Sequence, residues 1–182
     1  LMSHQSERGE VDVFSTICRD ITKQKQQQAQ MARLSSAVKQ TADSVMITGL
    51  DGRIEYVNPA FESISGYAAK DILGSTPNIL KSGQQTKDFY TRLWQTILAG
   101  KPFHDVFINR HKSGSFYYEE ITISPIFDEH GKVTAFLSTG KDATDRMHRQ
   151  ERYQYLAQHD VLTDLPNRTL LYDRLSHALQ HR

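Results

Sequence analysis

The segment Thr86-Lys-Asp-Phe-Tyr-Thr-Arg-Leu-Trp-Gln-Thr-Ile-Leu-Ala99 is the part of the chain from which the remaining elements can be placed. Its apolar side chains recur on one side of a helix, at Phe89, Tyr90, Leu93, Trp94, Ile97 and Leu98. Asp88 lies in the first turn, Gly100 follows the last turn, and Pro102 prevents continuation. The segment therefore predicts an amphipathic helix with one broad apolar face.

Three strand-like runs follow this helix, at 103–110, 115–127 and 132–141. The connections His111–Gly114 and Asp128–Gly131 have the composition of tight turns, which predicts antiparallel pairing. A helix that must bury one face beside such a sheet predicts an α+β domain built in layers. A ligand cavity is expected between the helix and the sheet.

The residues before the helix predict the other half of the same domain. Two strands, 44–48 and 53–57, form a hairpin, and Asn58 caps a short helix that has proline at its first position. A second short helix is expected at 68–73, and 75–85 is expected to be a loop. The predicted order is two strands, three helical segments and three strands.

Composition limits the classes of function. The chain has 182 residues and a formal net charge of +1, with 22 basic and 21 acidic side chains, so no nucleic-acid partner is expected. No apolar run is long enough for a membrane span, and no leader is recognised, which favours a cytoplasmic location. Cys18 is the single cysteine, so neither a disulfide nor a multi-cysteine metal site is expected.

The first 22 residues resemble a later part of the chain. Residues 7–22 and 129–144 share Glu, Gly, Val, Phe, Asp and Thr at a constant offset, which suggests the end of a preceding copy of the central domain. Residues 23–44 are polar and mostly helix-forming, with a sparse apolar stripe typical of a linker helix that pairs in a coiled coil. We expect a homodimer formed through the helices that flank the domain.

The central region resembles a PAS domain. The resemblance covers residues 34–146 and rests on motifs in order: Asp51-Gly-Arg-Ile-Glu-Tyr-Val-Asn-Pro-Ala-Phe61, Gly66-Tyr67, Asn109-Arg110, Gly114 and Asp142-Ala-Thr144. It implies a five-stranded antiparallel sheet with helices on one face, and a role in sensing and signal relay. Asp142 and Thr144 match the junction at which the last strand of such a domain passes into a signalling helix, here expected at 147–158.

The tail looks like the opening of a GGDEF domain, the family that makes cyclic di-GMP. The match is Asp160-Val-Leu-Thr-Asp-Leu-Pro-Asn-Arg168 within a truncated segment, 159–182, and a further helix is expected at 169–179. The chain contains no Gly-Gly pair, so the signature turn of that family is absent. Asp160, Asp164 and Asn167 are therefore interpreted as a loop that begins a fold. We expect this chain to be no enzyme itself and its parent protein to be a diguanylate cyclase.

The positions of histidine and cysteine limit which cofactors the domain can hold. None of the eight histidines lies between Val57 and Gly100, where PAS haem ligands usually occur, so haem is disfavoured, and no metal site is expected. Light-oxygen-voltage photochemistry needs a cysteine in the domain, and Cys18 lies outside it. The run from Ile79 to Arg110 is instead similar to FAD-binding redox sensors of nitrogen-fixation regulation, which implies that Trp94 and Asn109 would contact the flavin ring.

Strand alternation extends this candidate site. Phe103, Phe107 and Asn109 share one face of their strand, and Glu119 lies on one face of the next. The chain departs from the FAD sensors at three places. Those sensors carry a glutamate in the loop where this chain has Pro77 and Asn78, and a tryptophan where it has Phe103. The charge of Asp105 is also unusual in that strand. Two alternatives remain. The domain is a dimerisation scaffold whose cavity holds no ligand, or it senses another small metabolite.

Overall fold

The computed structural model describes residues 3–5, 11–13, 22–160, 163, 165–168 and 171. The chain divides into two compact units, Leu1–Ala37 and Val38–Arg182, which are treated separately. In the first, β1 (Ser3–Gln5) pairs antiparallel with β2 (Val11–Val13). The predicted copy of a preceding domain falls mostly on residues outside the described part, so it stays a prediction.

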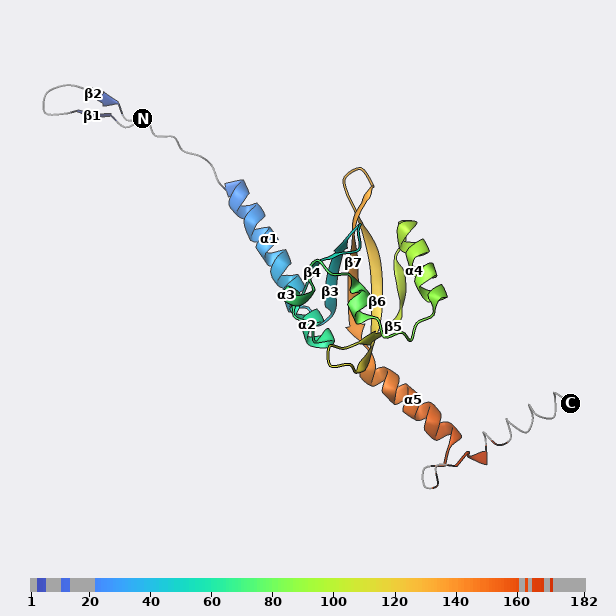
Figure 1. The fold of residues 1–182 in the computed structure, drawn as a ribbon. Coiled ribbons are helices and arrows are strands. Elements are labelled where there is room, and N and C mark those ends of the chain that lie inside the picture. Colours follow the sequence, from blue (N-terminus) through green and yellow to red (C-terminus); the bar gives the residue numbers. More distant parts are fainter. Residues whose placement is uncertain are drawn as a thin grey trace. The chain divides into compact units, whose positions relative to one another are not determined.

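The second unit contains a five-stranded sheet in the order β4-β3-β7-β6-β5, with every neighbouring pair antiparallel (Figure 1). The strands are β3 (Ser44–Gly49), β4 (Ile54–Val57), β5 (Phe103–Arg110), β6 (Phe116–Phe127) and β7 (Val133–Asp142). The predicted strands agree with these bounds to within one residue. The α+β prediction and the five-stranded antiparallel sheet are confirmed.

The helical elements between β4 and β5 all pack on one face of this sheet. They are α2 (Pro59–Ser65), α3 (Ala69–Ile72), the 3₁₀ helix η1 (Pro77–Leu80) and α4 (Lys87–Leu98). Asn58 caps α2 as predicted, and Gly66 ends it with a φ of 76°, a conformation in which a Cβ would be strained. The loop predicted at 75–85 contains η1, which the sequence analysis missed because such a short turn has no periodicity to detect.

Helix α4 begins at the predicted place, where Thr86 accepts a hydrogen bond from the Phe89 backbone, but it buries less than its sequence indicates. Only Leu93 and Ile97 are fully buried. These two side chains are four residues apart, so they form one ridge of the helix that rests on the sheet. Trp94 and Leu98 lie beside that ridge and are 47% and 69% exposed.

The core consists of two groups of buried side chains. One joins α4 to β5, β6 and β7 through Leu93, Ile97, Phe103, Phe107, Ile121 and Phe136. The other joins β4 to the short helices through Ile54, Val57, Phe61, Ile72 and Leu80. The register of the sheet places the strand residues of both groups on the same face.

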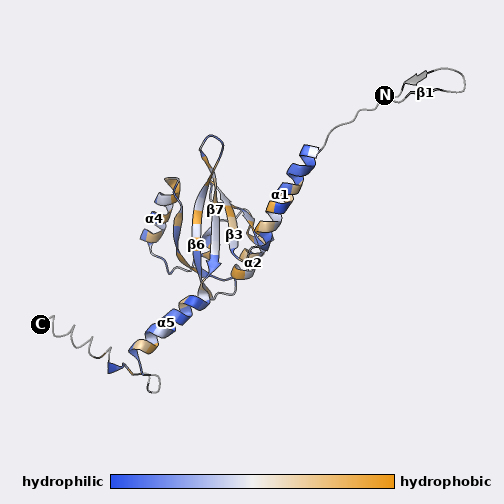
Figure 2. Cartoon of the chain, turned by 180° about the vertical axis from the view of Figure 1, so that it is seen from behind, coloured by the Kyte–Doolittle hydropathy of each residue, from blue (hydrophilic) through white to orange (hydrophobic). Residues whose placement is uncertain are grey.

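Two helices flank the sheet domain in the sequence: α1 (Thr22–Gln40) and α5 (Thr144–Gln158). Neither has a buried residue, and Figure 2 shows both coloured mostly as hydrophilic. Among the described residues no helix has the length and apolarity that crossing a membrane requires. The helix predicted at 169–179 lies largely outside the described residues.

Asn58 connects three segments at the start of the domain. Its Oδ1 accepts from the backbone N–H of Val45 and of Phe61, both at 2.9 Å. Its Nδ2 donates to the backbone oxygens of Val38 at 3.1 Å and Asp43 at 2.9 Å. The side chain is fully buried, so the last turn of α1, the start of β3 and the first turn of α2 depend on one amide.

We predict that Asn58→Ala destabilises the domain by about 3 kcal/mol, because it removes a helix cap and leaves buried backbone groups without partners. Urea unfolding followed by circular dichroism measures the loss. Thr86→Ala is the matched control: it removes the exposed cap of α4, and a loss of about 1 kcal/mol is expected. Equal losses in the two variants would contradict the connecting role of Asn58.

Candidate functional site

A cavity of about 290 Å³ lies between the sheet and the segments η1 and α4. Its walls take side chains from both core groups, including Leu80, Leu93, Phe107 and Phe136. The apolar lining also includes Met46, Leu50, Pro77, Tyr90, Trp94, Ile97, Ile121 and Ile123. The enclosing residues are therefore mainly aliphatic and aromatic, as expected of a small-molecule site.

Two sets of polar residues line this cavity, one buried and one more exposed. Thr48, Asn109 and Ser138 contribute from the strands, and all three are largely buried. The β3–β4 turn and the η1 segment contribute more exposed polar residues, among them Asp51, Asn78 and Lys81. The Lys81 ammonium lies over the Tyr90 ring, 4.6 Å from its centroid, which places a cation beside the aromatic wall.

Three of the five predicted ligand contacts line this cavity: Trp94, Phe107 and Asn109. Phe103 and Glu119 do not. Phe103 packs within the core, with its ring centroid 5.7 Å from that of Phe89 and 6.2 Å from that of Phe107. Asp105, the unusual charge of that strand, is explained by an ion pair with Arg92 at 2.8 Å.

Glu119 lies behind Asn109, as seen from the cavity. Asn109 Nδ2 donates to Glu119 Oε2 at 2.9 Å, and the Ser44 hydroxyl donates to Glu119 Oε1. Glu119 is 3% exposed. Its burial raises its pKa, the hydrogen bonds from Ser44 and Asn109 oppose that rise, and the charge of Asp142 adds to it. The sequence analysis missed Ser44, which is 75 residues away in the chain and carries no motif.

Gly140 makes room for this carboxyl. It pairs with Ser44 across β3–β7 and with Ile121 across β6–β7. A Cβ built on Gly140 would lie 2.7 Å from both Glu119 Cδ and Ser44 Oγ, which is closer than real side chains approach. The absence of a side chain at this strand position is therefore what admits the buried network.

The predicted junction residues hold the start of α5. Asp142 Oδ1 accepts from the backbone N–H of Thr144 at 2.8 Å, and Thr144 Oγ1 accepts from the backbone N–H of Tyr118 at 3.1 Å. The Tyr118 hydroxyl donates to Glu151, seven residues after Thr144 in α5, at 2.9 Å. The last strand and the helix are thus tied to β6 by side chains on both sides of the turn.

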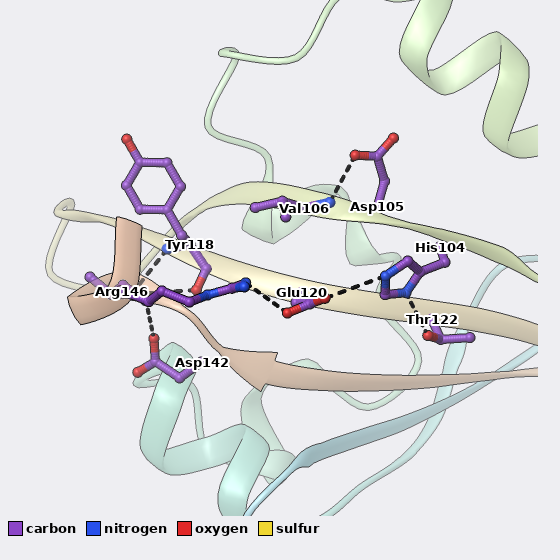
Figure 3. A network of polar contacts seen from close by, with 9 residues as sticks. His104, Asp105, Val106, Tyr118, Glu120, Thr122, Asp142 and Arg146 are labelled. Carbon is purple, nitrogen blue, oxygen red and sulfur yellow. Dashed lines mark hydrogen bonds and ion pairs between the residues drawn. The ribbon is translucent and has the colours of Figure 1, made fainter. Parts of the chain in front are cut away.

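On the face of the sheet opposite the cavity, Glu120 joins a second set of polar contacts to α5 (Figure 3). Arg146 contacts its Oε2 at 2.7 Å, and His104 Nε2 lies 3.4 Å from its Oε1. His104 Nδ1 is also 2.9 Å from the Thr122 hydroxyl. Glu119 and Glu120 are neighbours in sequence, yet they serve opposite faces: one contacts the cavity residue Asn109, and the other the helix.

The tail motif forms a compact loop at the end of α5. Asp160 Oδ1 accepts from the backbone N–H and the hydroxyl of Thr163, at 3.0 and 2.9 Å. Asn167 Nδ2 donates to the Ala157 backbone oxygen at 2.7 Å, and His159 bridges to Pro166. Asp160 and Asn167 therefore hold the backbone of this loop and of the end of α5. That the loop begins a further fold stays a prediction. Asp164 lies outside the described residues.

The family follows from comparison with known proteins. A family model described as the PAS fold matches residues 32–143, more than half of the chain, so the chain belongs to the PAS family. This agrees with the resemblance placed at 34–146. The PAS domain is a sensory signalling module.

Individual relatives are regulators and receptors. The chain is 27% identical over 138 residues to the nitrogen fixation regulatory protein of Klebsiella pneumoniae, covering 75% of this chain and 28% of that protein. It is 29% identical over 98 residues to the aerotaxis receptor of Escherichia coli, covering 54% of this chain and 19% of that protein. This chain thus corresponds to less than a third of either relative.

A solved structure of an RNA-binding light-oxygen-voltage receptor superposes with a TM-score of 0.66, covering 86% of this chain and 40% of that one. The sequence identity is 21%, so the likeness concerns the fold. Within the described residues, no group of three or more His, Cys, Asp or Glu side chains is placed to hold a metal ion.

We predict that Gly140→Ala destabilises the domain by about 2 kcal/mol, because the added methyl group displaces the buried carboxyl. Gly49→Ala is the matched control: its Cβ would meet Glu55, an exposed side chain that can move aside. Urea unfolding measures both. Combining Gly140→Ala with Glu119→Ala should recover part of the loss, and a fully additive double variant would argue against the proposed overlap.

The raised pKa of Glu119 also predicts how stability depends on pH. A carboxyl that binds its proton more tightly when folded favours folding below its unfolded pKa, and this contribution is lost as pH rises through the folded value. The free energy of unfolding should therefore fall as pH rises from about 4.5. Glu119→Gln should remove this fall, whereas Glu120→Gln, on the opposite face, should retain it. Identical pH profiles for wild type and Glu119→Gln would be inconsistent with a buried titrating carboxyl.

Proposed function

We propose that this PAS domain senses redox state or oxygen through a non-covalently bound flavin, FAD, in the cavity, and that it controls a cyclic di-GMP cyclase. The observation that carries the proposal is the position of Asn109. A single buried amide, on the strand facing α4, meets an otherwise mainly apolar cavity that has Trp94 beside it. A bound flavin supplies reversible, proton-coupled redox chemistry.

The residues present fit such a group. A flavin ring is flat and mainly apolar, with hydrogen-bonding atoms along one edge, which suits an aromatic wall and an amide. The cavity of about 290 Å³ is at the lower end of the range for ligand sites, so it would enclose the ring and leave a dinucleotide tail outside. Lys81 lies among the polar lining residues as a cation for the phosphates of that tail.

Hydrogen bonds connect the cavity with both flanking helices. From Asn109 they pass through Glu119 to Ser44, which directly precedes Val45, and Val45 is bonded to Asn58, the residue that holds the last turn of α1. Glu119 also pairs in register with Asp142, which holds the start of α5. A ligand that binds two arrangements of this network unequally would change the positions of both helices.

The output is proposed from the tail and from the exposed helix residues. The segment Asp160–Arg168 resembles the opening of a GGDEF domain, so the signal would reach a cyclase through α5. Helix α1 exposes Met31, Leu34 and Val38, spaced by three and four residues as in a coiled coil. Self-association through these flanking helices would transmit the change between two copies of the chain.

A second candidate is a ligand-free dimerisation scaffold. One observation favours it: Asn109 already has a protein partner in Glu119, so its burial needs no ligand. In that case the cavity would be a packing feature, and the module would only space the adjacent domains.

The deciding experiment is an absorption spectrum of the freshly purified chain, followed by heat release and chromatography of any chromophore. Bands near about 370 and 450 nm with released FAD are expected. Trp94→Ala and Asn109→Ala should each reduce flavin retention at least about tenfold. Gln95→Ala, an exposed neighbour on α4, is the control and should retain it.

The same preparations test the output. Light scattering should show a dimer, and the full-length parent protein should convert GTP to cyclic di-GMP at a rate that changes with flavin redox state in wild type but not in Asn109→Ala. A colourless dimer that binds no added flavin would favour the scaffold. Unchanged flavin retention in both Trp94→Ala and Asn109→Ala would contradict the assignment of the cavity as the flavin site.

A further inference from the structure

The buried network fixes which end of the Asn109 amide faces Glu119. Above its raised pKa the Glu119 carboxyl is ionised and can only accept hydrogen bonds, and only the Nδ2 end of an asparagine can donate to it. This agrees with the bond of 2.9 Å from Nδ2 to Glu119 Oε2. The other carboxylate oxygen already accepts from Ser44. Both carboxylate oxygens therefore accept from other strands of the sheet, one from β3 and one from β5.

The oxygen of the same amide is left for the cavity. Asn109 lines the cavity, and its side chain also has a hydrogen bond with the hydroxyl of Tyr117, its partner across the β5–β6 pair. An amide oxygen has two lone pairs, so an acceptor position remains for the cavity even when Tyr117 donates to it. A ligand in the cavity would meet an acceptor at this strand.

We propose that Glu119 is a positioning residue that orients Asn109, so that the site selects ligands presenting an N–H or O–H donor to β5. The inference uses the proposed function only to choose flavins as probes. Glu119 touches no ligand in this scheme. It acts by holding the Asn109 amide. A residue that does not line the cavity therefore determines whether the cavity presents a hydrogen-bond acceptor or a donor.

The surroundings of Glu119 make this orientation specific. Ser44 from β3 and Asn109 from β5 donate to it, Asp142 from β7 is the facing acidic group, and Tyr117 precedes it by two residues on its own strand. Burial raises the pKa of the Tyr117 hydroxyl, and the charge of Glu119 adds to that rise. The Tyr117 hydroxyl is a further hydrogen-bond partner of the Asn109 side chain. Asp142, the other acidic group of this set, is engaged with the backbone N–H of Thr144.

The test compares riboflavin with 3-methylriboflavin, in which a methyl group replaces the ring N–H. Binding to the flavin-free chain is measured by quenching of flavin fluorescence. Wild type should bind riboflavin at least about tenfold more tightly, the equivalent of one lost hydrogen bond. Glu119→Met leaves the amide free to turn, so the ratio between the two ligands should fall below about threefold.

The control is the same substitution one residue along. Glu120→Met removes a carboxyl from the opposite face of β6, away from the cavity, and should keep the wild-type ratio. A ratio between two ligands is insensitive to general loss of stability, so it reports orientation. A ratio that stays near tenfold in Glu119→Met would overturn the proposal.

A second measurement does not need a ligand. In ¹⁵N spectra, the side-chain amide of Asn109, assigned by its loss in Asn109→Asp, should exchange slowly with solvent in wild type and rapidly in Glu119→Met. If wild type binds neither flavin, the flavin function fails while this measurement still decides the orientation. Equal exchange in the two proteins would show that Glu119 does not hold the amide.

Discussion

The burial of one carboxyl shapes the centre of this domain. Burying the Glu119 carboxyl on the face of the sheet carries a desolvation cost, which well-placed hydrogen-bond donors offset. Ser44 and Asn109 are those donors, and they come from β3 and β5, on either side of the β6–β7 pair. Gly140 must lack a side chain for the three to meet. Ser44 is 75 residues from Glu119 in the chain, so the complete network forms only when β3, β7 and β6 are in register.

This arrangement gives the cavity two kinds of neighbour. In front, α4 and η1 contribute Leu80, Leu93, Tyr90 and Trp94 as an adaptable, mostly apolar wall. Behind, β5 and β6 hold a polar group whose direction is fixed by other polar groups. An apolar wall tolerates many ligands of similar shape, whereas a fixed buried amide discriminates by hydrogen bonding. In the proposed site, affinity and selectivity would therefore depend on different elements, which can vary independently.

Local sequence patterns were sufficient for most of the fold. Periodicity and turn residues placed the five strands, and Asn58 and Asp88 were sufficient to place the starts of α2 and α4. The same patterns overestimated how much of α4 is buried, since periodicity reports which side is apolar but not how wide a surface the sheet offers. Strand alternation also predicted that Glu119 points to the Asn109 side. It could not show that Glu119 lies behind Asn109, because that depends on Ser44, a contact with no local signature.

The short bridge between Lys81 and Asn109 has a consequence for solubility. Strand β5 is at the edge of the sheet, and an unprotected edge can pair with another chain. The segment after η1 covers this edge at the residue that faces the cavity. Entry of a ligand past that segment would require it to move, which would briefly uncover the edge. A chain purified without a ligand would then be the form most prone to aggregate, and filling the cavity would also protect the sheet from pairing with its neighbours.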